Sequence, residues 1–377
     1  MGYRRQAWVD VDLDAVERNV RTLKALTASG TRFMAVVKAD GYGHGALRAA
    51  QAALRAGADR IGVATIEEAL ELRMAGVTAS LHVLSEPPVS AADLVVRYDI
   101  VPALYSAEFA AALDAAATAT GSVAPYHLKV DTGMGRIGVR AEDAANLALE
   151  LRGSAGIRME GVFTHFATAD VPGDWEFDRQ MERFRGVLLK LKSEGIDAGT
   201  VHAANTAATI LHPETHLDMV RCGIGIYGLH PDRSTYGRIE LAPAMSVKAR
   251  VSQVKRIGMG DGVGYGFTYH ASAPTTIATL PLGYADGVHR VVSNRADVLI
   301  GGHRCRQVGR VAMDQLMVEV PERQSVRPGD EAVLVGAQGG ETITMDELAE
   351  HAQTINYELA CGFSLRMERR HLGAERH

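Results

Sequence analysis

The amino-acid sequence predicts an α/β protein, a (β/α)8 barrel of the TIM type followed by a C-terminal all-β domain. Helix-period and strand-period segments alternate up to about residue 235. The strand segments are short and apolar throughout, as expected for parallel strands that are covered on both faces. Beyond residue 235, short strands are separated by Asp-Gly and Gly-Gly turns. We therefore expect a barrel in residues 1–235 and a β domain in residues 236–377, to which residues 1–12 could add a strand.

Eight apolar runs are candidates for the barrel strands, and the stretches between them are long enough for crossover helices. One such helix has an apolar stripe at Val16, Val20, Leu23 and Leu26. An open, doubly wound sheet is the alternative, because periodicity alone does not count strands. The eight runs are Phe33–Lys38, Arg60–Ala64, Leu81–Leu84, Ile100–Ala103, Tyr126–Val130, Gly161–His165, Val201–Ala203 and Leu217–Arg221.

The second domain is predicted from six further runs and one short helix near Met345–His351. Trp8–Leu13 precedes the first barrel helix and could join the same sheet. The six runs are Val247–Val254, Thr276–Leu280, Asp297–Ile300, Arg306–Met313, Gln315–Val320 and Ala332–Val335.

The composition is that of an ordinary soluble globular protein. The 377 residues are 47% hydrophobic and 23% charged, with a net charge of -5, which argues against a nucleic-acid or anionic-membrane partner. Cys222, Cys305 and Cys361 lie far apart with no CxxC pair, so we expect a reducing cytoplasm and no metal site. No apolar segment follows Arg4 and Arg5, and no run is long enough to span a membrane.

Polar and reactive residues stand at the ends of several predicted strands. In a (β/α)8 barrel the carboxyl ends of the strands carry the active site, so these side chains should meet at one mouth. They are Lys38, Lys129, His165, Asn205 and Arg221.

Lys38 is the sharpest of these signals, because it ends an apolar strand and precedes the glycine-rich turn Ala39–Gly45. A lysine buried at this position is costly unless it is paired or covalently modified. Desolvation lowers the pKa of a lysine and makes it a nucleophile suited to Schiff-base chemistry. The alternative is a lysine whose stem follows the barrel rim while its ammonium stays in water.

The whole chain, from Val9-Asp-Val-Asp-Leu to Ile355-Asn-Tyr357-Glu, resembles the alanine racemases. The stretch Ala35-Val-Val-Lys38-Ala-Asp-Gly-Tyr42-Gly-His-Gly is similar to their pyridoxal-phosphate attachment signature, and the family pairs a (β/α)8 barrel with a C-terminal β domain. Seven further motifs follow in the family's order: Leu128–Gly138, Thr164–Asp170, His202–Thr206, Val220–Gly228, Val263–Gly266, Pro281–Gly287 and Gly309–Asp314.

The resemblance implies a homodimeric, pyridoxal 5'-phosphate (PLP)-dependent enzyme that interconverts L-alanine and D-alanine and supplies D-alanine for peptidoglycan. Lys38 would carry the cofactor and act as one of two acid/base groups, and Tyr265 of the partner subunit would be the other. Two bases on opposite faces let a proton leave one side and return on the other. By itself, Tyr265 could equally be a packing aromatic in a glycine-rich turn.

Arg221 is the most diagnostic residue that the resemblance assigns. Facing the pyridine nitrogen, an arginine can only donate, so this nitrogen would stay unprotonated. That weakens the electron sink and limits side reactions such as transamination. His165 would join Arg221 and Tyr265 in a hydrogen-bonded chain that favours the phenolate over its ordinary state with a pKa near 10.

The resemblance also implies a substrate site and a cofactor site. Arg136 and the Met313 backbone amide would hold the substrate carboxylate, with Lys129, Asp314 and Tyr284 in support. Lys129 matches a lysine that is carbamylated in some members of the family. The cofactor contacts besides Lys38, His165 and Arg221 would be Tyr42, Asn205, Thr206, Gly223, Ile224 and Tyr357.

Three other functions stay open from the sequence. The nearest is a serine or broad-specificity racemase, because Cys222, Ala312 and Thr206 depart from the usual family residues near the pocket. The others are a non-catalytic PLP carrier and a decarboxylase of this fold. Tyr265 argues against the carrier, which needs no second base, and Arg221 argues against the decarboxylase.

Overall fold

The computed structural model describes residues 6–322 and 324–373, and the chain divides into two compact units. The first unit, called the β unit here, comprises residues 1–14, 42–45 and 243–377. The second, called the barrel unit, comprises residues 15–41 and 46–242. The short segment Tyr42–Gly45 thus lies between two barrel elements in the sequence but belongs to the β unit.

The barrel unit is a closed parallel barrel, which confirms the predicted fold. Its strands follow the order β5-β4-β3-β2-β10-β9-β8-β6, and pairing between β5 and β6 closes the ring. Each of the eight predicted runs contains or overlaps one of these strands. They are β2 (Arg32–Val36), β3 (Arg60–Val63), β4 (Ser80–Val83), β5 (Ile100–Leu104), β6 (Ala124–Asp131), β8 (Ile157–Phe163), β9 (Thr200–His202) and β10 (Met219–Cys222).

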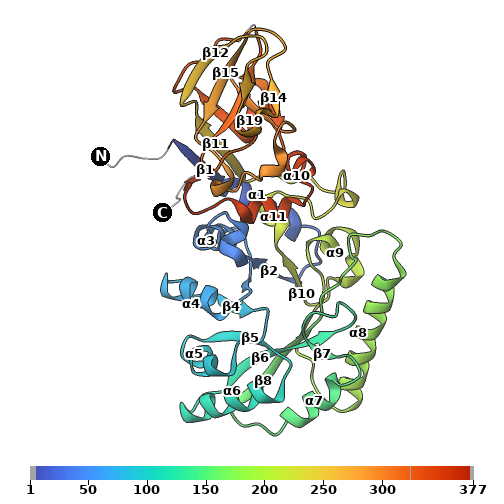
Figure 1. Cartoon of the computed structure of the whole chain (residues 1–377). Helices are drawn as coiled ribbons and strands as arrows, with labels where there is room; N and C mark the ends of the chain where they lie inside the picture. Colours follow the sequence, from blue (N-terminus) through green and yellow to red (C-terminus); the bar gives the residue numbers. More distant parts are fainter. Residues whose placement is uncertain (1–5, 323, 374–377) are drawn as a thin grey trace. The chain divides into compact units, whose positions relative to one another are not determined.

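Helices follow the strands and cover the barrel (Figure 1). In α1, Val16, Val20 and Leu23 are fully buried, but the helix ends at Lys24, so the predicted stripe residue Leu26 is exposed. The helices are α1 (Leu13–Lys24), α2 (Lys38–Tyr42), α3 (Ala46–Arg55), α4 (Ile66–Met74), α5 (Ala92–Arg97), α6 (Ala107–Ala119), α7 (Ala144–Leu151), α8 (Trp175–Ser193) and α9 (Thr206–Leu211).

The β unit is built on a sheet with the order β12-β15-β18-β17-β16-β19-β11-β1-β21. β1 (Ala7–Asp12) pairs with β11 antiparallel and with β21 in parallel, so the first strand of the chain joins this sheet. Within the β unit, β13 and β14 form a separate two-stranded sheet, and β20 pairs with β19. The other strands of the unit are β11 (Met245–Arg250), β12 (Gln253–Ile257), β13 (Gly262–Val263), β14 (Tyr269–His270), β15 (Thr275–Leu280), β16 (Asp297–Ile300), β17 (His303–Val308), β18 (Leu316–Val320), β19 (Glu331–Gln338), β20 (Glu341–Ile343) and β21 (Glu368–Leu372).

Two predicted strands of the β unit are shorter than expected. The run Val247–Val254 is broken after Arg250, because the amides of Val251 and Ser252 donate to Asp330 and Thr279 and the chain changes partner strand. The run Arg306–Met313 ends at Val308, because side chains take the amides that follow: Asn294 accepts from Gly309 and Ser293 from Val311.

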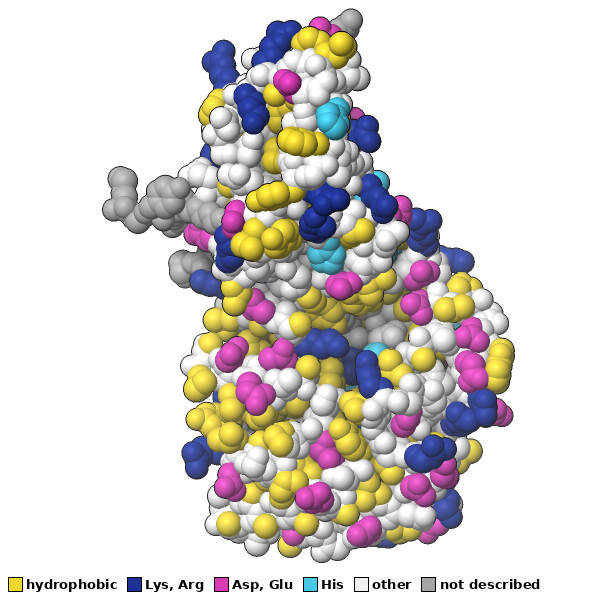
Figure 2. Space-filling model, viewed as in Figure 1, with side chains coloured by type: hydrophobic (Ala, Val, Ile, Leu, Met, Phe, Trp, Pro, Cys, Tyr) yellow, Lys and Arg dark blue, Asp and Glu magenta, His cyan; other side chains and the backbone are white. Residues whose placement is uncertain are grey.

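Helix α10 (Met345–Ala352) matches the predicted helix, whereas α11 (Asn356–Gly362) and β21 were not predicted. Among the described residues, no helix combines the length and apolar character needed to cross a membrane. On the face shown in Figure 2, acidic and basic side chains are interspersed over the surface. A mixed surface of this kind creates no strong long-range field of one sign.

Candidate active site

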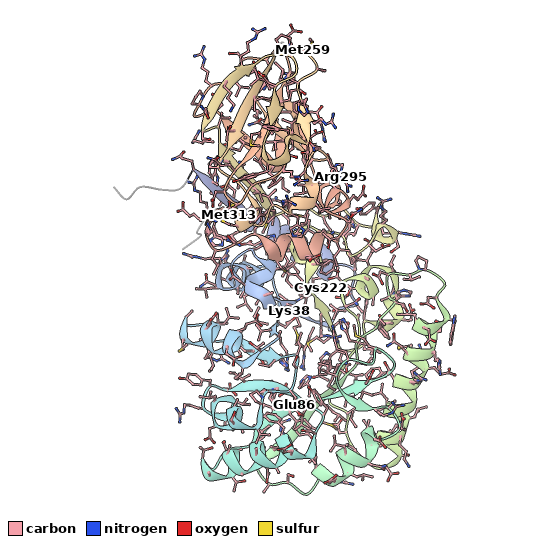
Figure 3. All side chains as sticks on the ribbon, in the orientation of Figure 1. Lys38, Glu86, Cys222, Met259, Arg295 and Met313 are labelled. Atoms are coloured by element: carbon pink, nitrogen blue, oxygen red, sulfur yellow. The ribbon has the colours of Figure 1, made fainter. Side chains whose placement is uncertain are left out.

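The predicted strand-end residues of the barrel unit come from neighbouring strands. Lys38 begins α2 directly after β2, and Arg221 lies in β10, which pairs with β2. Lys129 lies in β6, and His165 follows β8. Figure 3 shows Lys38 and Cys222 close to each other where β2 and β10 end. The carboxyl ends of the strands therefore bring these groups to one mouth, as barrel geometry requires.

The chain after Lys38 has an unusual left-handed conformation. Ala39, Asp40 and Tyr42 have φ values of 52°, 51° and 52°, and Gly41 lies between them at 62°. A non-glycine residue in this region costs about 1–2 kcal/mol, so outside contacts must hold the turn. The carboxylate of Glu68 supplies one of them, because it accepts the Ala39 amide at 2.6 Å. The turn fixes where the Lys38 side chain leaves the backbone.

Arg221 is buried with only 4% exposure, and its guanidinium donates to neutral acceptors. Nη2 donates to the Thr164 carbonyl at 2.8 Å, the Ala203 carbonyl at 3.0 Å and His165 Nδ1 at 3.1 Å. Within the described part of the chain it forms no ion pair with a carboxylate, and burial lowers its pKa to about 9. A buried cation of this kind favours one more hydrogen-bond acceptor beside it.

The hydrogen bonds of Arg221 continue through the barrel interior in a fixed direction. Nη1 donates to His202 Nδ1 at 3.1 Å, and because arginine only donates, the proton of His202 must sit on Nε2. His202 Nε2 then donates to His127 Nδ1 at 2.7 Å. His127 Nε2 lies 3.9 Å from a Glu160 oxygen that also pairs with Arg60 at 2.6 Å. This series of hydrogen bonds thus runs from Arg221 to His127, which faces the Glu160 carboxylate.

Burial keeps His165, His202 and His127 of this hydrogen-bonded series neutral. It lowers the pKa of His202 and His165 well below the ordinary value, and the charge of Arg221 lowers both further. The pKa of His127 is also lowered, chiefly by burial. The pKa of Glu160 is lowered to about 2, first by its interaction with His127 and then by Arg60. A neutral His165 that accepts at Nδ1 must present a donor at Nε2.

Lys129 is the second buried cation of the barrel unit, with 4% exposure. Burial first, and then the charge of Arg221, lower its pKa to about 7, although Asp131 opposes the shift. Its ammonium donates to the Val130 carbonyl at 3.2 Å. A large share of Lys129 is therefore uncharged at neutral pH, and that is the form of an amine that reacts with carbon dioxide. Arg136 is exposed on the loop after β6 and contributes to the same shift.

The predicted cofactor contacts Asn205, Thr206, Gly223 and Ile224 of the barrel unit lie at two helix starts. Asn205 is the N-cap of α9, where its Oδ1 accepts the Ala208 amide at 2.9 Å. The Thr206 hydroxyl accepts the Gly223 amide at 3.1 Å. Ile224 begins the short 3-10 helix η3 (Ile224–Tyr227), so its amide has no acceptor within that helix.

The β unit carries the remaining predicted residues. The rings of Tyr42 and Tyr357 lie 6.2 Å apart between centroids. Tyr265 begins the 3-10 helix η5 (Tyr265–Phe267) and is 72% exposed. Met313, labelled in Figure 3, is 52% exposed.

The Met313 segment packs against the turn that carries Tyr284. Its Ala312 and Met313 carbonyls accept the amides of Tyr284 and Ala285, each at 3.0 Å. The Asp314 carboxylate accepts from Arg366 at 2.7 Å. The two segments are thus held as one rigid corner of the β unit.

Comparison with known proteins decides the family. Residues 11–231 match the family model described as alanine racemase, N-terminal domain, and residues 244–371 match the corresponding C-terminal domain. The chain belongs to the alanine racemase family. The alanine racemase of Symbiobacterium thermophilum is 48% identical to it over 97% of both chains.

Solved structures of alanine racemases have the same fold as this chain. The alanine racemase of Bacillus anthracis with bound L-Ala-P has a TM-score of 0.93 at 38% identity and covers 99% of this chain and 96% of its own. That of a D-cycloserine-producing Streptomyces lavendulae has a TM-score of 0.94 at 38% identity, covering 99% and 98%. Alanine racemases therefore share this fold along essentially the full length of the chain.

Several residues of this alanine racemase fold were not singled out from the sequence. His127 and Glu160 lie inside strands rather than at their ends, so the strand-end rule does not find them. His202 stands in a quoted motif, but its bond to Arg221 depends on the pairing of β9 with β10. Glu68 belongs to a capping box with Thr65, a pattern that the sequence does contain.

Proposed function

We propose that this protein is a PLP-dependent alanine racemase that interconverts L-alanine and D-alanine. The observation that carries the proposal is the buried Arg221, which shares the barrel mouth with Lys38 and has no carboxylate partner in the described chain. Membership of the alanine racemase family supports the same reaction. The substrate is a small amino acid, and D-alanine would serve peptidoglycan synthesis in the cytoplasm.

The donor set fits PLP. Lys38 would bind the cofactor aldehyde, Arg221 its ring nitrogen, and the phosphate would lie among Asn205, Thr206, the amides of Gly223 and Ile224, Tyr42 and Tyr357. When bound, PLP withdraws electrons from the substrate and acidifies its Cα–H bond. Since Arg221 can only donate a hydrogen bond, it would leave the ring nitrogen unprotonated and keep this electron sink moderate.

Two protein groups would move the proton. The Lys38 amine takes it from, or returns it to, one face of the substrate, and the partner subunit's Tyr265 serves the other face. The 72% exposure of Tyr265 within a single chain supports this, because a second copy would be needed to cover it. His165, which accepts from Arg221, has its Nε2 proton available to stabilise a phenolate.

Arg136 and the Met313 amide would fix the substrate carboxylate, and Tyr284 and Asp314 support this corner from the β unit. An arginine fork binds a carboxylate with two parallel hydrogen bonds, which sets the orientation of Cα between the two bases. The uncharged form of Lys129 limits its repulsion of Arg136.

The test is the rate of racemisation of alanine, serine and lysine by the purified protein, followed by circular dichroism. We expect alanine to be the best substrate. A preference for serine or lysine would establish the broader racemase, and a yellow protein without any racemisation would establish a PLP carrier. Borohydride reduction should attach a pyridoxyl group to the peptide that contains Lys38, and a label elsewhere contradicts the assignment.

A further inference from the structure

The segment that carries Tyr42 is held by the far end of the chain. Tyr42, Gly43 and His44 are sequence neighbours of Lys38, yet they belong to the β unit together with the C-terminal residues. Their conformation is left-handed at Tyr42 (φ 52°) and Gly43 (φ 79°). Because such a conformation is costly for tyrosine, the segment depends on contacts from outside itself.

Each of the three carbonyls of this segment accepts a hydrogen bond from a side chain. The Tyr42 carbonyl is 2.9 Å from His44 Nδ1. The Gly43 carbonyl accepts from Arg369 Nε at 3.2 Å, and the His44 carbonyl accepts from His371 Nε2 at 2.8 Å. Arg369 and His371 are alternate residues of β21, so they lie on the same face of that strand.

Arg369 also holds the loop that follows α11, the helix that carries Tyr357. Its Nη1 donates to the Ser364 carbonyl at 2.6 Å, and its Nη2 donates to the Phe363 carbonyl at 2.5 Å. One guanidinium therefore links the backbone next to Tyr42 with the backbone that ends α11. The fork of arginine suits this task, because its five donors are rigidly spaced.

The glycines of the segment are explained by the same contacts. A Cβ at Gly43 would collide with the Ala360 carbonyl of α11, and a Cβ at Gly45 would lie 2.7 Å from His371 Nε2. Both approaches are closer than a side chain allows. Gly43 and Gly45 therefore let the segment dock on α11 and β21.

We propose that Arg369 and His371 are positioning residues for the cofactor phosphate. By holding Tyr42–His44 against α11, they keep the phenols of Tyr42 and Tyr357 together, 6.2 Å apart between ring centroids, so that both can bind one phosphate. This rests on the proposed function, since it concerns the PLP site. It assigns the phosphate affinity of the site partly to residues far from Lys38 in the sequence.

The experiment compares PLP with pyridoxal, which has the same aldehyde and ring but no phosphate. Apoenzyme is titrated with each compound, and binding is followed by cofactor absorbance and protein fluorescence. Arg369→Gln and His371→Ala should each raise the Kd for PLP by about tenfold, because a displaced Tyr42 would lose its hydrogen bond to the phosphate. Their Kd for pyridoxal should change by less than about twofold on the same scale.

Arg370→Gln is the matched control. Arg370 is the residue between the two on β21, and its guanidinium lies 4.3 Å from the centre of the Trp8 ring, away from the segment. The Kd values of the Arg370→Gln variant for PLP and pyridoxal should equal those of the wild type. Tyr42→Phe gives the reference loss for a missing phosphate contact, and Gly43→Ala should show the same selective loss as Arg369→Gln.

The outcomes separate two failures. If the wild type does not prefer PLP to pyridoxal, the proposed function fails. If it does, but Arg369→Gln and His371→Ala keep that preference, or weaken both ligands equally, the positioning role is wrong. Should Arg369→Gln not fold, Arg369→Lys, which keeps the charge but loses the fork, and His371→Ala decide the question by the same ratio.

Discussion

The barrel unit buries the two cations Arg221 and Lys129, whereas the β unit exposes Tyr265 and Met313. Arg221 and Lys129 are each 4% exposed, but Tyr265 is 72% and Met313 52% exposed. Burial lets the barrel tune charge, because desolvation shifts the pKa of both cations. Under the proposed function, the barrel residues of one chain would form one half of the site, and Tyr265 of a second copy would belong to the other half.

The largest expected effect tests whether Tyr265 of one subunit serves the active site of the other subunit. Lys38→Ala and Tyr265→Ala should each lower racemisation by on the order of 10³-fold, because each removes one acid/base group. In a mixed dimer one site carries both changes and the other neither. Reassorting equal amounts gives about half mixed dimers, so about a quarter of all sites should recover. No recovery in mixed dimers of proven composition would place Tyr265 in its own chain's site.

The next effect tests the buried half. Arg221→Glu should lower racemisation by on the order of 10²-fold, since it replaces a fixed donor with a carboxylate that can hold a proton on the ring nitrogen. Transamination of alanine to pyruvate should rise at the same time, as should absorbance at long wavelength. Arg221→Gln, which cannot protonate the nitrogen, is the control. Equal losses in both variants without new side products would leave Arg221 a structural role only.

Lys129 provides a pH test of burial. Its pKa is about 7 in the folded protein against an ordinary 10.5, so between these values the unfolded chain binds the additional proton. Stability should therefore rise with pH across this window, and the penalty is fully present below pH 7. Lys129→Met should remove this contribution, which is on the order of 5 kcal/mol.

Urea unfolding of both proteins from pH 6 to about 10.5 measures the difference, with Lys190→Met on the surface as the control. A wild-type curve parallel to that of Lys129→Met would contradict a free amine at position 129. Such a result would instead fit a carbamylated lysine, which mass spectrometry of the native protein would reveal.

The smallest expected effect concerns the turn after Lys38. Ala39 is exposed and has a φ of 52°, so Ala39→Gly should increase the free energy of unfolding by about 1 kcal/mol. Ala111→Gly, at an exposed position in α6, should decrease it by about 1 kcal/mol. If urea unfolding shows free-energy changes of opposite sign for the two variants, the left-handed conformation of Ala39 is confirmed. A loss at both positions would show that Ala39 is not strained.

The sequence predicted the barrel well because a buried parallel strand needs an unbroken apolar run. It predicted the mouth residues through the same geometry, as Lys38 and Arg221 end such runs. The strand ends of the β unit were harder to predict. Its half-exposed antiparallel strands end where their hydrogen-bond partners change, and the sequence pattern does not show this. The end of β17 at Val308, for instance, follows from side chains of Asn294 and Ser293 that lie elsewhere in the sequence.

By itself, the sequence determined the family, the barrel strands and the set of candidate site residues, because these depend on local pattern and on motifs in order. Only the tertiary structure decided which residues act together. The hydrogen-bonded path from Arg221 to His127 crosses β10, β9 and β6 and ends 3.9 Å from Glu160 of β8, and the Tyr42 segment is held by β21. Hydrogen bonds between distant segments require distances and directions that no local pattern encodes. Burial is likewise a property of the packed molecule, and it is the largest cause of the lowered pKa values of Lys129 and Arg221.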